Sequence, residues 1–491
     1  MIEKAPTLRG ATVLRGATVL RGATVTVQLH ADSDLDTVLR RLEKLLRFGL
    51  RFIELRDDLL DDDQLLWLAA RLPSDQRLLS LRRHRHRTGT LALIESVRPA
   101  LLDYALELGR TPTLDALCIS TEPHRQVILS THTRTQGESL TAQLDRLSHA
   151  HPAPLLLKAA LPIQSLAELW EGHLWHLQNP QRHLFLPISA DGSGRFRFYR
   201  LLQGESLLLN FLRDEDAPLI PDQPTWEEWT TRHAVPMPHQ PPIPFAAILG
   251  DPVEHSRTPA HHQDFFAKLG MPVLKIKIPE EETRSSAVLP ILRGLGLRAA
   301  AVTSPLKLWL YEVIRESGGR WESASSDSDE AGAGNTLAVT PLGTLLGTST
   351  DGIGLRTAWQ SVLRQHAPLL GPAPRLAVFG GGGLLPLLRV CFPAALFLSA
   401  RTGTLRDAAE SPSAVAVLIW SVGRSRYVSP PPTWLRPQLV FDLNYAADSP
   451  GRDFAQEISA VYVDGSEFFV AQAAAQQAFW QAHLSTVAEV R

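Results

Sequence analysis

The sequence is poor in cysteine, with two in 491 residues, Cys118 and Cys391, far apart in the chain. Two distant cysteines do not make a disulfide scaffold or a cysteine-ligated metal site, and they suit a reducing compartment. No apolar run reaches the roughly 18–20 residues that span a bilayer, and the N-terminus lacks the apolar segment of a signal peptide. We therefore expect a cytoplasmic protein with no metal and no membrane partner.

The chain also lacks a strong charge of either sign. Its formal net charge is −2 and it has no long basic stretch, which argues against a nucleic-acid partner. Hydrophobic residues make up 44% of the chain and charged residues 20%, a globular composition, and 491 residues are too many for one ordinary core. We expect two or three domains that bind small molecules, and the sequence leaves the oligomeric state open.

A hexapeptide repeat occupies the N-terminus. Leu-Arg-Gly-Ala-Thr-Val occurs three times in tandem, at 8–13, 14–19 and 20–25. Three short copies do not stack into a solenoid core. We interpret residues 1–23 as a repeated, poorly ordered leader, and we expect the third copy to run into a strand at Thr24–Leu29.

The first half alternates short apolar runs with amphipathic stretches such as Asp34–Leu50. Eight candidate strands that alternate with helices over about 200 residues predict a (β/α)8 TIM barrel at 24–234. The candidate strands are Thr24–Leu29, Arg51–Arg56, Arg77–Arg82, Leu101–Leu108, Gln126–His132, Pro154–Ala160, His183–Ser189 and Glu205–Leu212.

A proline-rich segment follows the predicted barrel. Trp226 and Trp229 indicate that its first part still packs on the barrel, whereas 235–243 is too rich in proline for a helix or central strand and reads as a linker. Strands and helices alternate again from Phe245 onward, so we predict an α/β domain at 244–351 plus 467–491, completed by a helix over Phe468–Val487.

A dinucleotide-binding (Rossmann) domain is predicted at 352–466. A strand at Leu376–Phe379 leads into four glycines and a helix start at Leu384–Val390, and a second strand spans Ala395–Ser399. This βαβ pattern lets glycine backbone approach a pyrophosphate, which makes Gly380, Gly382 and Gly383 candidate cofactor residues. Arg401 and Thr402 follow the second strand, where an arginine favours the 2′-phosphate of NADP(H) over NAD.

Five motifs of the second half come in the order found in shikimate dehydrogenases, and the half resembles that family. They are Gly250-Asp-Pro-Val-Glu-His-Ser-Arg-Thr258, Val302-Thr-Ser-Pro-Leu-Lys307, Gly332-Ala-Gly-Asn-Thr336, Gly347-Thr-Ser-Thr-Asp-Gly-Ile-Gly354, and Gly465 through Gln472. The resemblance implies that Lys307 and Asp351 are catalytic and that the substrate is bound by Ser256, Thr258, Thr303, Asn335 and Gln472. In isolation, Lys307 would read as a surface lysine and Asp351 as a helix N-cap.

Three motifs of the first half resemble type I 3-dehydroquinate dehydratases. They are Glu54-Leu-Arg-Asp-Asp58, Ser130-Thr-His132 and Leu155-Leu-Leu-Lys158. A lysine that ends an apolar run is costly to bury and gains a nucleophilic amine by desolvation; otherwise it snorkels to water. The resemblance implies that Lys158 forms a Schiff base, that His132 is the general acid/base, and that the substrate is bound by Glu54, Arg56, Arg82, Arg197 and Gln223.

Several positions depart from these family patterns. His86 stands where the dehydratase family has a glutamate that supports its histidine, Thr133 replaces an aspartate, and Phe196 replaces a serine. In the second half, Ser349 replaces an asparagine, and Trp420 lies where the dehydrogenases have Asn-x-Thr-Pro near the nicotinamide. The departures in the first half leave open the pKa and the tautomer of His132.

Together the resemblances imply a bifunctional shikimate-pathway enzyme. The first half would dehydrate 3-dehydroquinate, and the second half would reduce the product, 3-dehydroshikimate, with NADPH. Two alternatives keep the same fold. One is a catabolic quinate or shikimate dehydrogenase that uses NAD, against which Arg401 argues. The other is a dehydrogenase whose barrel is an inactive scaffold or regulatory domain.

Overall fold

The computed structural model describes residues 22–29, 34–109, 114–115, 117, 126–151, 155–213, 220–233, 242–324, 332–406, 414–422 and 429–484. The chain divides into two compact units, Met1–Ala234 and Val235–Arg491. The first two hexapeptide copies, most of the expected linker and Cys118 lie outside the described residues.

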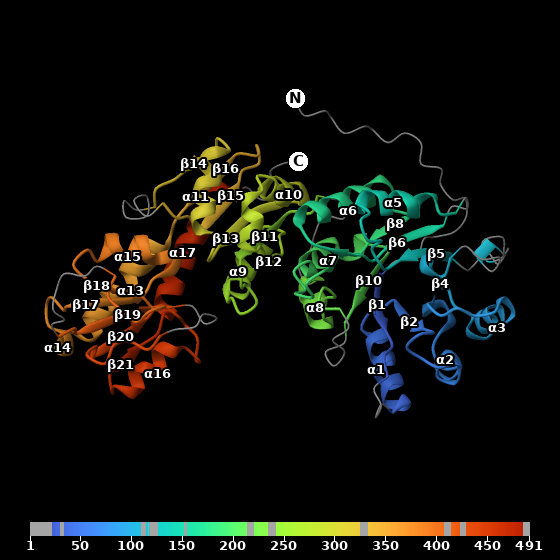
Figure 1. Ribbon diagram of the computed structural model, residues 1–491, viewed down its shortest axis with the longest axis horizontal. Coiled ribbons are helices and arrows are strands. Elements are labelled where there is room, and N and C mark those ends of the chain that lie inside the picture. The colour runs from blue at the N-terminus through green and yellow to red at the C-terminus, as the bar shows by residue number, and fades with distance from the viewer. Residues whose placement is uncertain are drawn as a thin grey trace. The chain divides into compact units, whose positions relative to one another are not determined.

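The first unit is built on one eight-stranded parallel sheet (Figure 1). Its order is β10-β1-β2-β3-β4-β5-β6-β8, so chain neighbours are sheet neighbours and the last strand lies beside the first. Within the described residues β8 does not pair with β10, which leaves the barrel nearly closed. The strands are β1 (Gly22–Thr26), β2 (Phe52–Arg56), β3 (Arg77–Leu81), β4 (Leu101–Ala105), β5 (Gln126–Thr131), β6 (Leu156–Ala159), β8 (His183–Phe185) and β10 (Leu209–Leu212).

Helices alternate with these strands, and most begin at a side chain that caps free backbone amides. Asp61 and Gln64 form a reciprocal capping box at α2, while Ser139 and Ser165 cap α5 and α6. The helices are α1 (Leu35–Arg47), α2 (Asp62–Ala69), α3 (Arg87–Val97), α5 (Leu140–His149), α6 (Leu166–Gln178), α7 (Arg197–Gln203) and α8 (Trp226–His233), with 3-10 turns η1 (Ser74–Gln76), η2 (Leu106–Leu108) and η3 (Gly204–Ser206).

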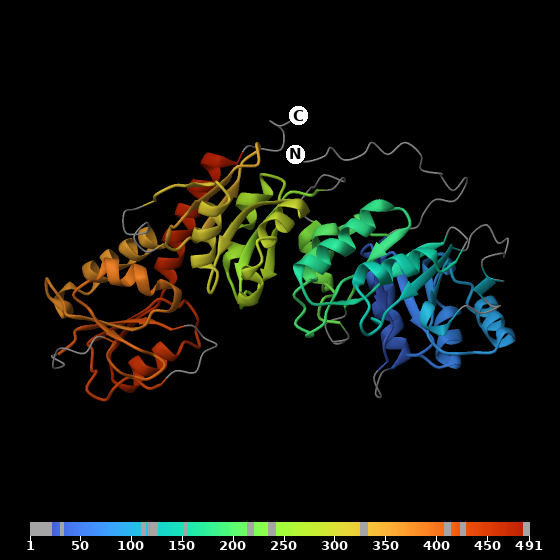
Figure 2. The ribbon, with the colours of Figure 1, turned by 45° about the horizontal axis from the view of Figure 1, so that its top comes forward.

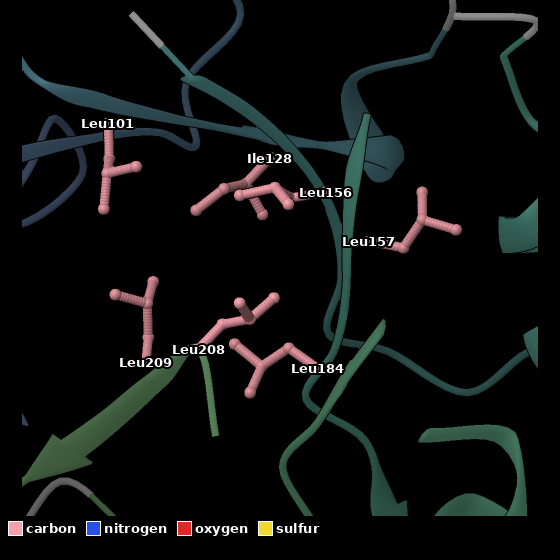
Figure 3. Close-up of a pocket in the computed structure, with 7 residues that line it drawn as sticks. All are labelled: Leu101, Ile128, Leu156, Leu157, Leu184, Leu208 and Leu209. Carbon is pink, nitrogen blue, oxygen red and sulfur yellow. The ribbon is translucent and has the colours of Figure 1, made fainter. Parts of the chain in front are cut away.

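The inside of the sheet has an apolar layer and a polar layer. Side chains on one face of a strand recur every second residue, so each apolar residue is followed two positions later by a polar one. Figure 3 shows the apolar layer, where leucines and Ile128 surround a small cavity. The paired positions are Phe52 and Glu54, Leu78 and Ser80, Leu101 and Asp103, Ile128 and Ser130, and Leu156 and Lys158. The polar layer therefore lies toward the carboxyl ends of the strands, where α/β barrels carry their chemistry.

The second unit begins with a mixed six-stranded sheet of order β12-β11-β13-β15-β16-β14. Strand β15 runs antiparallel to both neighbours, and the other pairs are parallel. The elements are β11 (Phe245–Gly250), α9 (Thr258–Ala267), β12 (Val273–Lys277), η4 (Glu280–Arg284), α10 (Val288–Leu295), β13 (Leu297–Val302), α11 (Lys307–Glu316), β14 (Arg320–Trp321), β15 (Thr336–Val339) and β16 (Leu345–Thr348).

A second sheet of this unit is parallel throughout, in the order β18-β17-β19-β20-β21. Apolar clusters cover both of its faces, as a doubly wound sheet requires. The elements are α13 (Asp351–Gln365), α14 (Ala367–Leu370), β17 (Leu376–Gly380), η5 (Gly382–Leu384), α15 (Leu385–Cys391), β18 (Leu396–Leu398), β19 (Val417–Ser421), β20 (Leu439–Asp442), α16 (Pro450–Glu457) and β21 (Val461–Val463).

The last helix, α17 (Ser466–His483), joins the two sheets of the second unit. Phe468 lies in the core of the parallel sheet, and Trp480 lies in the core of the mixed sheet, where its indole N–H donates to Leu337 O at 2.9 Å. A Cβ at Gly354 of α13 would lie 2.9 Å from Phe468 O, so glycine is needed for α13 and α17 to pack this closely. Figure 2 shows α17 in red between the orange and the yellow elements.

The α/β class and the parallel sheets expected from the sequence are confirmed, and several boundaries need correction. The strand expected at Leu101–Leu108 ends at Ala105, because the chain turns into η2. The run His183–Ser189 is two strands, β8 and β9 (Ile188–Ser189), and β9 pairs with β7 (Pro162–Ile163). Pro187 separates them, since proline has no amide to donate to a ladder.

Candidate active sites

Asp103 is the centre of a buried charge cluster in the first unit. It lies on β4 with no exposed surface, and its Oδ2 accepts from Lys158 Nζ at 2.5 Å and from Arg82 Nη2 at 2.9 Å. Ser130 donates to Oδ1 and accepts from Arg82 Nη1 at 2.8 Å. Burial raises the pKa of Asp103, but the charges of Arg82 and Lys158 outweigh it and hold that pKa well below its usual range.

Lys158 is a desolvated amine at the end of β6. It is 3% exposed, and its Nζ lies 4.4 Å from the centre of the Phe211 ring. Burial lowers the pKa of Lys158 despite the opposing charge of Asp103. A lowered pKa increases the fraction of neutral amine, which is the nucleophilic form.

Glu54 and Arg56 both lie on β2 beside this cluster, but they have different partners. Glu54 accepts hydrogen bonds from Ser80 Oγ at 2.6 Å and from Thr26 Oγ1 at 2.5 Å. Arg56 forms a two-bond ion pair with Asp58, whose nearest atoms are 2.6 Å apart. Glu54 therefore belongs to the buried polar layer, and Arg56 lies at its partly exposed rim.

His132 follows β5, and its carboxylate partner is Glu107 in η2. Glu107 Oε1 accepts from the backbone N–H of His132 at 2.6 Å, and Glu107 Oε2 lies 3.8 Å from His132 Nδ1. Burial lowers the pKa of His132, while Glu107 opposes that shift. His86, in the place of the family's glutamate, is exposed at the start of α3.

Arg197 and Gln223 lie in the first unit beside Pro221 rather than in the charge cluster. Arg197 donates from Nε to Pro221 O at 2.8 Å and pairs with Glu228 at 3.1 Å. Gln223 is buried. Over the described part of the unit, no hydrogen bond or ion pair joins Arg197 or Gln223 to Lys158 or Asp103.

In the second unit, Lys307 and Asp351 form a buried ion pair. Lys307 Nζ donates to Asp351 Oδ2 at 2.6 Å, and the two residues are 8% and 2% exposed. Each is the first residue of its helix, α11 or α13. The positive end of a helix dipole stabilises the carboxylate of Asp351 and destabilises the ammonium of Lys307. The lysine therefore depends on the aspartate to offset this unfavourable interaction.

Asn335 ties this pair to α17. The side-chain Nδ2 of Asn335 donates to Asp351 Oδ1 at 2.9 Å. Its backbone carbonyl oxygen accepts from Gln476 Nε2 at 3.0 Å. His262 Nε2 lies 3.3 Å from Gln476 Oε1, and burial lowers the pKa of His262 to about 4. The imidazole of His262 is therefore neutral at pH 7, and a buried chain of neutral groups holds the ion pair.

The remaining substrate candidates occupy three loops and helices of the same unit. Ser256 Oγ accepts from the backbone N–H of Thr258, the first residue of α9, at 3.2 Å. Thr303 follows β13, and Gln472 lies on α17 against Gly354. Within the described residues, the side chains of Thr303 and Gln472 have no hydrogen bond, which leaves them available to a ligand.

The glycine turn after β17 fits a dinucleotide. Gly380, Gly381 and Gly382 have φ of 92°, 116° and 47°, which side chains disfavour. A Cβ at Gly381 would lie 2.9 Å from Leu385, and one at Gly383 would lie 3.1 Å from Ser304 Oγ. The turn is thus kept open by the absence of side chains, at the carboxyl end of a parallel strand and next to the loop that leads into α11 and Lys307.

Two arginines follow β18, and one of them contacts the glycine turn. Arg401 and Thr402 follow β18 and are exposed, so both are available to a phosphate. Arg406, which the sequence did not single out, donates from Nη2 to Gly380 O at 3.4 Å. Trp420, which stands where the dehydrogenases have Asn-x-Thr-Pro, is 2% exposed and packs in the core between Phe379 and Phe454.

Five residues that complete these sites were not among the sequence candidates. Four of them contact a candidate that lies far away along the chain, and His262 contacts one of these four, Gln476, so the sequence next to each residue does not reveal the contact. The one signal in the first unit is a pair of acids four residues apart, Asp103 and Glu107, within an otherwise apolar run. The five residues are Asp103, Glu107, His262, Arg406 and Gln476.

Comparison with known proteins gives relatives for the second unit. Residues 248–337 match the family model of the shikimate dehydrogenase substrate binding domain. The shikimate dehydrogenase (NADP(+)) of Methylobacillus flagellatus is 28% identical over 263 residues, which cover 48% of this chain and 93% of that protein. The enzyme of the same name from Citrifermentans bemidjiense is 34% identical over 139 residues, or 28% of this chain and 43% of that one.

One solved structure aligns with both units. It is the dehydroquinate dehydratase and shikimate dehydrogenase from S. pombe AroM, at 16% identity and a TM-score of 0.33, over 96% of this chain and 97% of that one. Within the described residues, no helix has the length and hydropathy to cross a membrane, and no three potential metal ligands cluster. The family match places a substrate-binding domain of the shikimate dehydrogenase type in the second unit.

Proposed function

We propose that the second unit is an NADP-dependent shikimate dehydrogenase that reduces 3-dehydroshikimate to shikimate. The observation that carries this proposal is the buried Lys307–Asp351 pair, whose lysine belongs to the matched substrate-binding domain. Its relatives over nearly their full length are shikimate dehydrogenases that use NADP(+). The open glycine turn and the exposed Arg401 support the same cofactor.

The protein supplies charge and a proton at the ketone oxygen. Bound NADPH supplies the hydride to C3 of the substrate. The Lys307 ammonium stabilises the oxygen as it gains negative charge and donates the proton that completes the alcohol. Asp351 holds Lys307 at a fixed position, and Asn335 fixes Asp351. Ser256 and Thr258 hydroxyls donate to the substrate carboxylate, while Thr303 and Gln472 reach the ring hydroxyls.

We propose that the first unit is a type I 3-dehydroquinate dehydratase. A neutral Lys158 amine adds to the C3 ketone, and the resulting carbinolamine takes up one proton and loses water, which gives an iminium. His132 removes the proton from C2, which the iminium acidifies, and returns it to the C1 hydroxyl as that group leaves as water. Hydrolysis of the imine releases 3-dehydroshikimate and restores Lys158. Burial of Lys158 supports this role, and Arg82 beside it supplies positive charge for the substrate carboxylate.

A two-step assay on the purified full chain tests both proposals. Enone absorbance with 3-dehydroquinate alone, followed by consumption of NADPH and formation of shikimate, is the expected result. Borohydride added with 3-dehydroquinate should leave a reduced adduct on Lys158 that mass spectrometry locates. If NADPH is consumed only with 3-dehydroshikimate and Lys158 carries no adduct, the dehydratase proposal is wrong and the barrel is a scaffold. Faster turnover with NAD+ and quinate would refute the biosynthetic assignment.

A further inference from the structure

We propose that Glu107 is the positioning residue for His132, supplied by the strand next to His132 in the sheet in place of the carboxylate that position 86 lacks. The inference rests on the proposed dehydratase function. It assigns to Glu107 two tasks, which are to fix the turn that carries His132 and to keep its imidazole a competent base.

The first task follows from the contacts of one carboxylate oxygen. Glu107 Oε1 accepts from the backbone N–H of His132 at 2.6 Å, from that of Thr133 at 3.1 Å and from Thr131 Oγ1 at 3.1 Å. These donors are three consecutive residues at the end of β5. Strands β4 and β5 pair in register up to Ala105 and Ser130, so η2 brings Glu107 directly opposite the turn.

The second task follows from the other oxygen. Glu107 Oε2 lies 3.8 Å from Nδ1 of His132, whereas Nε2 is buried and has no hydrogen-bond partner in the described part of the unit. A proton on Nδ1 is favoured by the facing carboxylate, and this tautomer leaves the lone pair on Nε2. Nε2 is therefore the nitrogen that can take a proton from a substrate.

The charges around His132 show why a carboxylate is needed there. Burial and the cations Arg82 and Lys158 disfavour the imidazolium, while Asp103 and Glu107 favour it. Asp103 is already shared by Arg82, Lys158 and Ser130. Glu107 is the acid that hydrogen-bonds the His132 turn, and the charge of His132 in return lowers the pKa of Glu107 after burial raises it.

Position 86 does not fill this role. His86 is exposed and begins α3, and it has no contact with His132 among the described residues. The nearby Asp57 is occupied, because it accepts from the backbone N–H of Arg82 at 2.6 Å and from Arg85 Nε at 3.2 Å. The carboxylate partner of His132 thus comes from β4 rather than from the loop after β3.

Glu107→Gln in the full chain tests the inference. Glutamine keeps an oxygen for the backbone amides but removes the charge. Carbon-13 NMR of histidine-labelled protein, with His132 assigned by His132→Gln, should show a pKa of His132 lower than in the parent. The acid limb of kcat/KM for dehydration should move to lower pH, and kcat should fall by about 10²-fold, within the usual contribution of acid–base groups. KM and borohydride trapping on Lys158 should change little.

Two further variants separate charge from structure. Glu107→Asp keeps the charge, so the pKa of His132 should lie between its values in Glu107→Gln and in the parent. Glu138→Gln, whose carboxylate pairs with Arg146 at 3.0 Å, should leave both readouts at parent values. An unchanged His132 titration in a folded Glu107→Gln protein overturns the inference. Absence of dehydration in the parent overturns the proposed function instead, and the NMR titration still decides whether Glu107 tunes His132.

Discussion

The two units each bury a lysine–aspartate pair, and the pairs are built differently. In the first unit, Lys158 comes from a strand, and its partner Asp103 also binds Arg82 and Ser130. In the second unit, Lys307 and Asp351 begin two helices, and the aspartate is held by the neutral Asn335. The Nζ–Oδ2 distances are nearly equal, 2.5 Å and 2.6 Å.

The different surroundings of the two lysines suit them to different chemical roles. Lys158 shares one carboxylate with a second cation and has its pKa lowered by burial, so a neutral, nucleophilic amine is accessible. Lys307 has a carboxylate that no second cation uses among the described residues, and its side chain is 11% exposed. That arrangement suits a fixed ammonium that stabilises a developing oxyanion.

Removal of Lys158 should have the largest effect, because it should abolish one of the two activities and leave the other unchanged. Lys158→Ala eliminates the proposed nucleophile, so dehydration should fall by on the order of 10⁴-fold or more. Shikimate oxidation by NADP should remain at the parent rate, because Lys307 is untouched. Separate steady-state assays of the two steps measure this. Lys44→Ala, an exposed lysine of α1, is the control, and dehydration that survives in Lys158→Ala would contradict the proposed Schiff base.

Removal of the aspartate should lower the free energy of unfolding more in the first unit than in the second. Asp103→Asn leaves Lys158 and Arg82 buried without a counter-charge, which should lower the free energy of unfolding of the first unit by about 3–5 kcal/mol. Asp351→Asn leaves one cation rather than two without a counter-charge and should cost about 1–3 kcal/mol. Urea unfolding monitored separately for each unit gives both values.

The double variant Asp103→Asn/Lys158→Met is the matching control for that stability difference. It removes the stranded lysine and should recover part of the loss, since an apolar side chain of similar volume replaces an unpaired charge. Equal costs for the two single variants would mean that the shared cation in the first unit has no energetic consequence.

The catalytic effect of Asp351 should be confined to the second unit. Asp351→Asn keeps a hydrogen-bond acceptor for Lys307 but removes the charge that fixes the ammonium, so kcat for reduction of 3-dehydroshikimate should fall by about 10²–10³-fold. Dehydration should be unaffected. Stopped-flow loss of NADPH absorbance measures the effect, with Asp453→Asn, an exposed acid of α16, for comparison. A parent-like kcat in Asp351→Asn would rule out its proposed role.

Acid should weaken both units over the same pH range, because each buries a histidine whose pKa is lowered by burial. Burial lowers the pKa of His173 and of His262 to about 4. The unfolded chain takes up these protons near pH 6.5, so stability is complete above about pH 6.5 and falls as the pH approaches 4, by on the order of 2 kcal/mol for each histidine. Denaturant unfolding at pH 7 and pH 4.5 measures it.

His173→Gln and His262→Gln should each flatten the pH dependence of their own unit, whereas His84→Gln, at an exposed position, should not. A pH response that persists in a folded His173→Gln protein would assign the acid sensitivity of the first unit to other groups, among them His132 and His183, whose pKa values burial also lowers.

Much of the fold follows from the sequence, because buried parallel strands are short apolar runs and each run marks one strand. The break at Pro187 and the turn at Leu106 were missed, since both lie inside apolar stretches that read as continuous. The sequence located Lys158 and Lys307 but not their full surroundings. Asp103 meets Lys158 from 55 residues away, and Gln476 meets Asn335 from 141 residues away. Such contacts depend on sheet order and helix packing rather than on local letters.

The path of α17 has a consequence for how the second unit is made. Trp480 completes the core of the mixed sheet, yet the ribosome synthesises it only after the whole parallel sheet. The earlier strands β11 to β16 must therefore wait for a late segment before their core is closed. Any fragment that stops short of α17 exposes apolar surface on both sheets at once. Neither half of this unit can therefore complete its core during synthesis or as a separately expressed fragment without α17, although each half has a sheet of its own.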